Sequence, residues 1–163
     1  MEYIPVQHQE ALGQRYRTAA IIVMAFIISV LVYMVIAKFI TVNDIKPGTE
    51  SWIQPVYSAA IVLGVVVVAL RRFLLSKTVM GTARQTGVSA VLNQLFTMTI
   101  ILCALAELTG IAGLVLYLLT GNYDYSLRLG AVSLIVLLYT FPRKGEWERA
   151  VADSAKAQSA TAR

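Results

Sequence analysis

The sequence predicts an all-α integral membrane protein, a bundle of four transmembrane helices with both termini in the cytoplasm. Three observations predict this fold. Of the 163 residues, 58% are hydrophobic and only 14% are charged, and the mean hydropathy of +0.69 is well above that of soluble domains. The apolar residues fall into long blocks, which is typical of chains that have a bilayer as their solvent. Finally, the basic residues gather in alternate connectors between these blocks.

The first two spans are predicted at about 18–40 and 53–70. The first apolar run is long enough to cross roughly 30 Å of hydrocarbon as a helix, and it is longer than the apolar core of a secretory signal peptide. Pro47 and Gly48 mark a turn between the two runs. The second run ends in valines that would suit a buried strand in water, but within lipid only a helix satisfies its own backbone groups.

The third and fourth spans are predicted at about 91–119 and 127–141. The third exceeds the hydrocarbon thickness, so we expect its first turns to protrude into the headgroups or the helix to tilt. The fourth has the shortest uncharged run, which Arg128 can extend by pointing its charge outward, and Pro142 ends it.

The distribution of basic residues predicts the topology. Two of them, Arg15 and Arg17, precede the first span. A basic loop joins the second and third spans through Arg71, Arg72, Lys77 and Arg84, and the fourth span is followed by Arg143, Lys144 and Arg149. The other two connectors carry only Lys46 and Arg128 close to the spans. Because cytoplasmic loops are enriched in Lys and Arg, we expect a multi-pass protein of the bacterial inner membrane with both ends inside.

The two terminal segments are more polar than the spans. The segment before residue 18 is either a short interfacial helix or a loosely ordered tail, and it carries the only histidine, His8. We expect 143–163 to form a polar cytoplasmic tail with Trp147 anchored at the membrane surface. The whole chain, 1–163, is expected to be a single membrane domain.

Glu107 is the acidic residue that lies deep within an apolar run. An ionised carboxylate costs several kcal/mol at such a place, so it is normally protonated, paired or turned toward protein. Two interpretations remain open: a proton- or ion-binding carboxyl, or a neutral acid that hydrogen-bonds between helices.

Small residues accompany Glu107 at spacings of four and three. They are Thr99, Cys103, Ala106, Gly110 and Gly113. This spacing keeps them on one stripe of a helix, where small side chains let a second helix approach closely. We interpret the stripe as a helix-packing seam, and we expect Gly64 with Ala60 and Gly130 with Ser133 to supply facing notches.

The sequence lacks the motifs of several functional classes. It contains no phosphate-binding loop, no HExxH and no GxSxG, so we expect no enzyme active site and no cofactor. One cysteine cannot form an intramolecular disulfide or a cysteine metal cluster. No motif that stacks on bases or reads a groove accompanies the net charge of +5, so we expect no nucleic-acid partner.

Part of the chain resembles a known family. Ala83, Arg84 and Gln85 precede a helix that contains the string 104–108 and then 113–115, and this arrangement is similar to the c subunit, or proteolipid, of rotary ATP synthases. The resemblance covers about 83–115, and the first and fourth spans have no counterpart in a helical hairpin. It implies that Glu107 matches the carboxyl that binds the translocated proton or sodium ion, and that Arg84 and Gln85 match the cytoplasmic loop.

Together these patterns favour a non-catalytic accessory or structural subunit of a larger membrane complex. Its partners are the lipid bilayer and other membrane subunits, in a hetero-complex or, alternatively, a homo-oligomer. A proton- or ion-translocating subunit that uses Glu107 is the second hypothesis. A small transporter or channel acting alone is the third, although no inverted repeat is visible in the sequence.

Overall fold

The computed structural model of the chain describes residues 6–40, 50–74 and 87–161. Within these residues it contains helices and no strand, so the all-α prediction is confirmed. The helices are α1 (Val6–Phe39), α2 (Glu50–Leu74), α4 (Val88–Thr120), α5 (Tyr123–Thr140) and α6 (Lys144–Thr161). Two residues predicted in the basic loop, Lys77 and Arg84, lie outside the described residues, as does Gln85.

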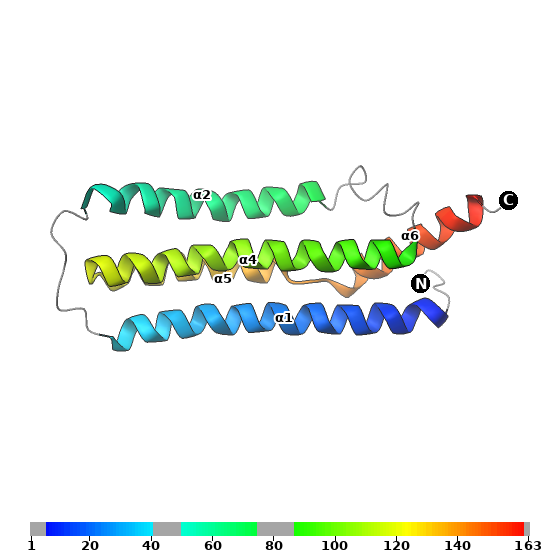
Figure 1. Ribbon diagram of the computed structural model, residues 1–163, viewed down its shortest axis with the longest axis horizontal. Helices are drawn as coiled ribbons and strands as arrows, with labels where there is room; N and C mark the ends of the chain where they lie inside the picture. Colours follow the sequence, from blue (N-terminus) through cyan, green and yellow to red (C-terminus); the bar gives the residue numbers. More distant parts are fainter. Residues whose placement is uncertain (1–5, 41–49, 75–86, 162–163) are drawn as a thin grey trace.

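The helices α1, α2, α4 and α5 lie side by side along the length of the molecule (Figure 1). The centre of the bundle is the pair α4 and α5, and both α1 and α2 pack against both of these helices. Within the described residues the backbones of α1 and α2 do not pack against each other, because the two helices flank the central pair on opposite sides. The last helix, α6, packs on α4 and α1 at the end of the bundle where the N-terminus lies.

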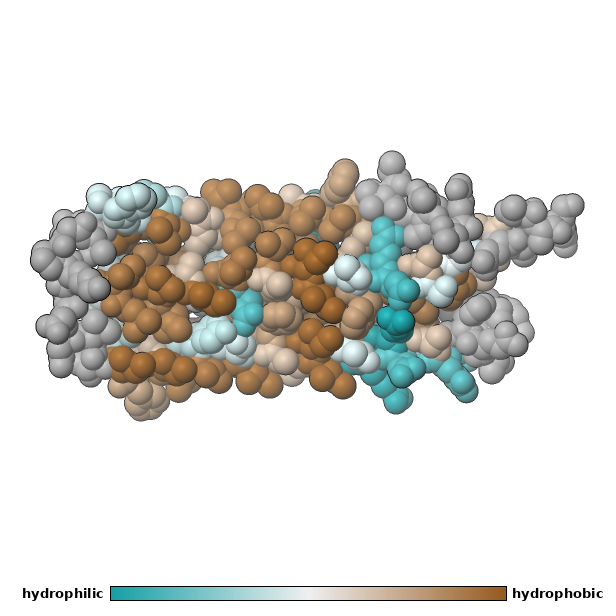
Figure 2. All heavy atoms as spheres, in the orientation of Figure 1, coloured by the Kyte–Doolittle hydropathy of each residue, from teal (hydrophilic) through white to brown (hydrophobic). Residues whose placement is uncertain are grey.

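Three helices are long and apolar enough to cross a membrane, over Gln9–Phe39, Ser51–Leu74 and Val88–Thr120. The fourth predicted span is different. It is long and apolar enough only when α5 and α6 are taken together, and the chain bends by 40° between these two helices. The described part of the chain therefore has three helices of this kind, or up to four if the bent pair is one span. Figure 2 shows hydrophobic residues over most of the bundle and hydrophilic residues gathered toward the end that carries α6.

Local signals in the sequence set the connections around α5. Gly121 ends α4 in the left-handed conformation, with φ 68°, and its N–H donates to the carbonyl of Tyr117. The Asn122 side chain then caps α5 by accepting a hydrogen bond from the backbone N–H of Asp124 at 3.0 Å. Pro142 follows α5, where its missing N–H stops the helix and separates it from α6.

Both terminal segments differ from their predictions. The N-terminal segment is part of α1, which runs from Val6 without a break instead of forming a separate interfacial helix or a loose tail. The C-terminal segment forms α6, whose Trp147 is 3% exposed rather than anchored at a membrane surface. Trp147 lies edge-on to Tyr16 of α1 and belongs to a core cluster with Val91 and Leu95 of α4. The burial of Trp147 against α1 and α4 therefore holds this otherwise polar helix on the bundle.

Candidate functional site

Glu107 lies half-buried on α4, on the side that faces α1. Two hydroxyl groups of α1 donate to its Oε1 atom: Ser29 Oγ at 2.7 Å and Tyr33 Oη at 2.9 Å. Ser29 and Tyr33 are four residues apart, so one face of α1 presents both hydroxyls to α4. Within the described part of the chain, no donor is placed on the other oxygen, Oε2.

This arrangement fits two chemical functions. As a structural group, the carboxyl joins α4 to α1 through two hydrogen bonds in an otherwise apolar stretch, each worth about 1 kcal/mol. As a binding group, a carboxyl with two neighbouring hydroxyls offers oxygen atoms to a proton or a small cation. Among the described residues no group of three or more His, Cys, Asp or Glu side chains gathers to hold a metal ion.

The predicted seam residues all lie buried on α4. They are Thr99, Cys103, Ala106, Gly110 and Gly113. The buried Ser133 of α5 reaches this seam and donates to the carbonyl of Ala106 at 2.7 Å. Cys103 Sγ lies 3.8 Å from Thr140 Oγ1, also on α5. The seam therefore faces mainly α5, and its cysteine is a buried packing residue with a hydroxyl neighbour.

The two seam glycines allow neighbouring helices to approach α4 closely. A Cβ atom on Gly113 would lie 2.9 Å from Leu129 Cβ and 3.3 Å from Ser126 Cα, which are atoms fixed to the backbone of α5. A Cβ on Gly110 would lie 3.2 Å from a methyl group of Val30 in α1. The seam is thus filled by the helices of this chain.

The predicted facing notches are correct only in part. Ser133 does face the seam. Gly130, however, faces Met34 of α1, since an added Cβ would meet the Met34 Sδ at 2.8 Å. Gly64 of α2 faces Val132 of α5 rather than α4. The reason is that α1 and α2 pack into the grooves on opposite sides of the α4–α5 pair, so that Gly64 on α2 faces α5 and Gly130 on α5 faces α1.

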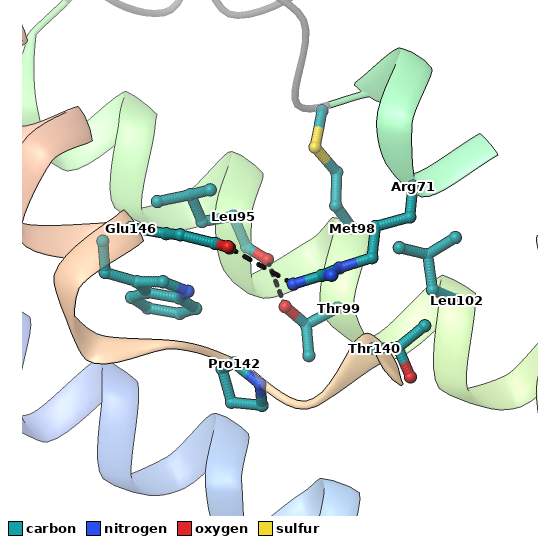
Figure 3. Close-up of a pocket in the computed structure, with 9 residues that line it drawn as sticks. Arg71, Leu95, Met98, Thr99, Leu102, Thr140, Pro142 and Glu146 are labelled. Carbon is teal, nitrogen blue, oxygen red and sulfur yellow. Dashed lines mark hydrogen bonds and ion pairs between the residues drawn. The ribbon is translucent and has the colours of Figure 1, made fainter. Parts of the chain in front are cut away.

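A second polar cluster lies where α2 ends and α6 begins (Figure 3). Arg71 is buried, with its side chain 8% exposed, and its Nη2 lies 3.2 Å from Glu146 Oε2. Glu146 also pairs with Arg143 at 3.6 Å. The Arg71 guanidinium lies over the ring of Tyr139 at 4.8 Å from its centroid. Arg72, the next residue of the predicted basic loop, is exposed.

The cavity beside this cluster is small. Its volume is about 20 Å³, and Arg71, Met98, Thr140 and Pro142 are among its lining residues (Figure 3). That is room for about one water molecule. The Arg71–Glu146 ion pair therefore holds α6 on the bundle. The cavity beside it has no space for a substrate.

The sequence analysis identified Glu107 as a group able to hydrogen-bond between helices, but it did not identify its partner Ser29 or the ion-pair residue Glu146. A signal for Ser29 was present in its spacing of four from Tyr33. For Glu146 no local signal existed, because its partner Arg71 lies 75 residues earlier in the chain.

No protein-family model, no curated protein and no solved structure matches this chain.

Proposed function

We propose that this protein is a non-catalytic accessory subunit of a larger membrane protein complex. In this proposal four helices lie in the bacterial inner membrane, with α5 as the fourth span and both termini in the cytoplasm. The described basic residues support the orientation. Most of them lie at the end of the bundle that carries α6: Arg15, Arg17, Arg71, Arg72, Arg143, Lys144, Arg149 and Lys156.

One observation carries the accessory function: the interior of the bundle is closed while its outside is apolar. Gly110 and Gly113 leave no space between α4 and its neighbours, and the seam is buried along its length. Large hydrophobic side chains instead point outward from α1, α2, α4 and α5. Such a molecule offers packing surfaces to lipid and to other helices rather than a path through its centre.

The test is the composition of the particle that contains this chain. The tagged chain is extracted from its native membrane in mild detergent and analysed by native mass spectrometry with proteomic identification. The same tag on an unrelated multi-pass protein of that membrane serves as the control. A hetero-complex of fixed stoichiometry, found only with this chain, is the expected result. A monomer, or an assembly made only of copies of this chain, would contradict the proposal.

Ion translocation through Glu107 is the second candidate, and the two hydroxyls on Oε1 favour it. In this function the carboxyl alternates between a proton-bound and an ionised form, as the resemblance to the proteolipid family implies. A hydrophobic carbodiimide, which reacts with protonated carboxyls in the membrane, then labels Glu107 less as the pH rises. Glu107→Gln is the matched control for specificity, and labelling that is absent in a folded sample would contradict this candidate.

A further inference from the structure

The outward side of α4 is open between α1 and α2. Because those two helices do not meet, Ile101, Leu108 and Val115 of α4 remain 43–49% exposed. We call these three residues the outer α4 face. This side of the molecule is the one seen in Figure 2, where a small hydrophilic area interrupts the hydrophobic surface.

Glu107 borders the outer α4 face, next to Leu108 in the chain. Its Oε1 atom is occupied by the hydroxyls of Ser29 and Tyr33, whereas Oε2 receives no donor from the described residues. The carboxyl is half-buried, so it is not sealed within the bundle. Hydrocarbon chains of lipid cannot hydrogen-bond, and a polar atom that faces them without a partner is costly.

The outward side of α5 provides a comparison within the same molecule. Ile135 and Leu138 are even more exposed there, at 67% and 63%. The one polar residue between 129 and 138, Ser133, points inward and donates to Ala106. Between 129 and 138 this side of α5 therefore presents no polar side chain that needs a partner. The outer α4 face is different, because Oε2 of Glu107 beside it receives no donor from the described residues.

We infer that the outer α4 face is the docking site for one transmembrane helix of a partner subunit. This helix is apolar and carries an uncharged hydroxyl or amide side chain at the level of Glu107. Hydroxyls and amides both donate and accept, so they pair with Oε2 whether or not it carries the proton. The inference rests on the proposed function, since it names the face through which the accessory subunit meets its complex.

Site-specific photocrosslinking in the native membrane tests the docking site. A benzophenone amino acid is placed at Leu108, and at Ile135 on the outward side of α5 as the matched control. We expect Leu108 to give one protein adduct, whose crosslinked peptide is a transmembrane segment of the partner with a hydroxyl or amide side chain. We expect Ile135 to give lipid adducts.

Two variants test the contribution of the carboxyl. Glu107→Leu is expected to lower the yield of the Leu108 adduct by about three- to tenfold, the effect of one lost hydrogen bond between helices. Glu107→Gln keeps hydrogen-bonding atoms at the same place, so its yield should stay within about twofold. As a second approach that leaves Glu107 intact, Leu108→Trp should displace the partner in co-purification, whereas Ile135→Trp should retain it.

Several outcomes would overturn the inference. These are lipid adducts alone from Leu108, equal protein adducts from Leu108 and Ile135, a crosslink to a second copy of this chain, or retention of the partner by Leu108→Trp. If the chain copurifies with a partner that contacts another face, the docking site is wrong and the proposed function stands. If native mass spectrometry finds no partner, both are wrong.

Discussion

The close packing of α4 against α5 at Gly113 predicts that one methyl group added there separates the two helices. In Gly113→Ala the new Cβ would lie 2.9 Å from Leu129 Cβ, well inside the 3.5–4.0 Å at which carbon atoms attract each other. The neighbouring atoms belong to the backbone of α5 or are attached to it, so a side-chain rotation cannot relieve the clash. The helices α4 and α5 have to move apart by about 0.5–1 Å.

The expected free-energy change follows from two opposing effects. Overpacking of a well-filled interior costs about 1–3 kcal/mol. Replacing glycine by alanine within a helix returns about 1 kcal/mol through its helix propensity. The net destabilisation of Gly113→Ala is therefore roughly 1 kcal/mol.

Gly13 of α1 supplies the matched control, since no atom lies within 4 Å of a Cβ added there. Gly13→Ala keeps the propensity gain without the clash and should stabilise the protein by up to about 1 kcal/mol. The assay is reversible unfolding by sodium dodecyl sulfate in mixed micelles, followed by far-UV circular dichroism. Opposite signs for the two variants are expected. Equal stabilisation of both would refute the close approach of α4 and α5 at Gly113.

Two further substitutions test the polar contacts. Glu146→Gln weakens the ion pair of buried Arg71, so α6 should pack less firmly on the bundle. The fluorescence emission of Trp147 should then shift to longer wavelength. It is measured in a variant in which Trp52, the other tryptophan, is replaced by phenylalanine. We expect the loss of stability to be smaller than the roughly 3–5 kcal/mol of a fully buried pair, because the Glu146 side chain is 35% exposed. An unchanged emission spectrum would contradict the role of this ion pair in holding α6. Ser133→Ala removes the hydrogen bond to the Ala106 carbonyl and should cost about 1 kcal/mol in the same micelle assay, whereas a neutral result would show that the bond contributes nothing.

Hydropathy predicted the three long helices of the bundle because each consists of one extended apolar run. The ends of these helices were less predictable, because a helix extends through polar residues when their side chains pack against another helix. The segment before residue 18 shows this clearly. Its Leu12 and Tyr16 pack against α4 and α6, so α1 starts at Val6 although the local sequence is polar.

The fixed position of α6 could not be deduced from its own sequence. Its composition is rich in alanine, serine and charges, which is also typical of a disordered tail. Trp147 and Val151 are buried because α1 and α4 extend beyond the rest of the bundle and provide a surface for them. That surface depends on contacts between residues more than fifty positions apart, which local patterns do not encode.

The seam was easier to predict than its neighbours. A spacing of four and three places Thr99 to Gly113 on one stripe of any α-helix, and the structure buries all five residues. The same periodicity says nothing about which helix lies opposite. Gly130 of α5, for example, faces α1 and not α4, because the arrangement of the four helices places α1 beside it.

The two candidate functions make opposite demands on Oε2 of Glu107. Ion translocation requires this oxygen to exchange protons or ions with water, whereas docking requires a fixed side chain of the partner to occupy it. Carbodiimide labelling of the intact complex and of the isolated chain separates the two. Labelling that appears only after the partner is removed supports docking, because a seated helix shields the carboxyl. Labelling that is equally fast in the native complex and declines with rising pH would instead favour translocation, and the outer α4 face would then be open to a path for ions.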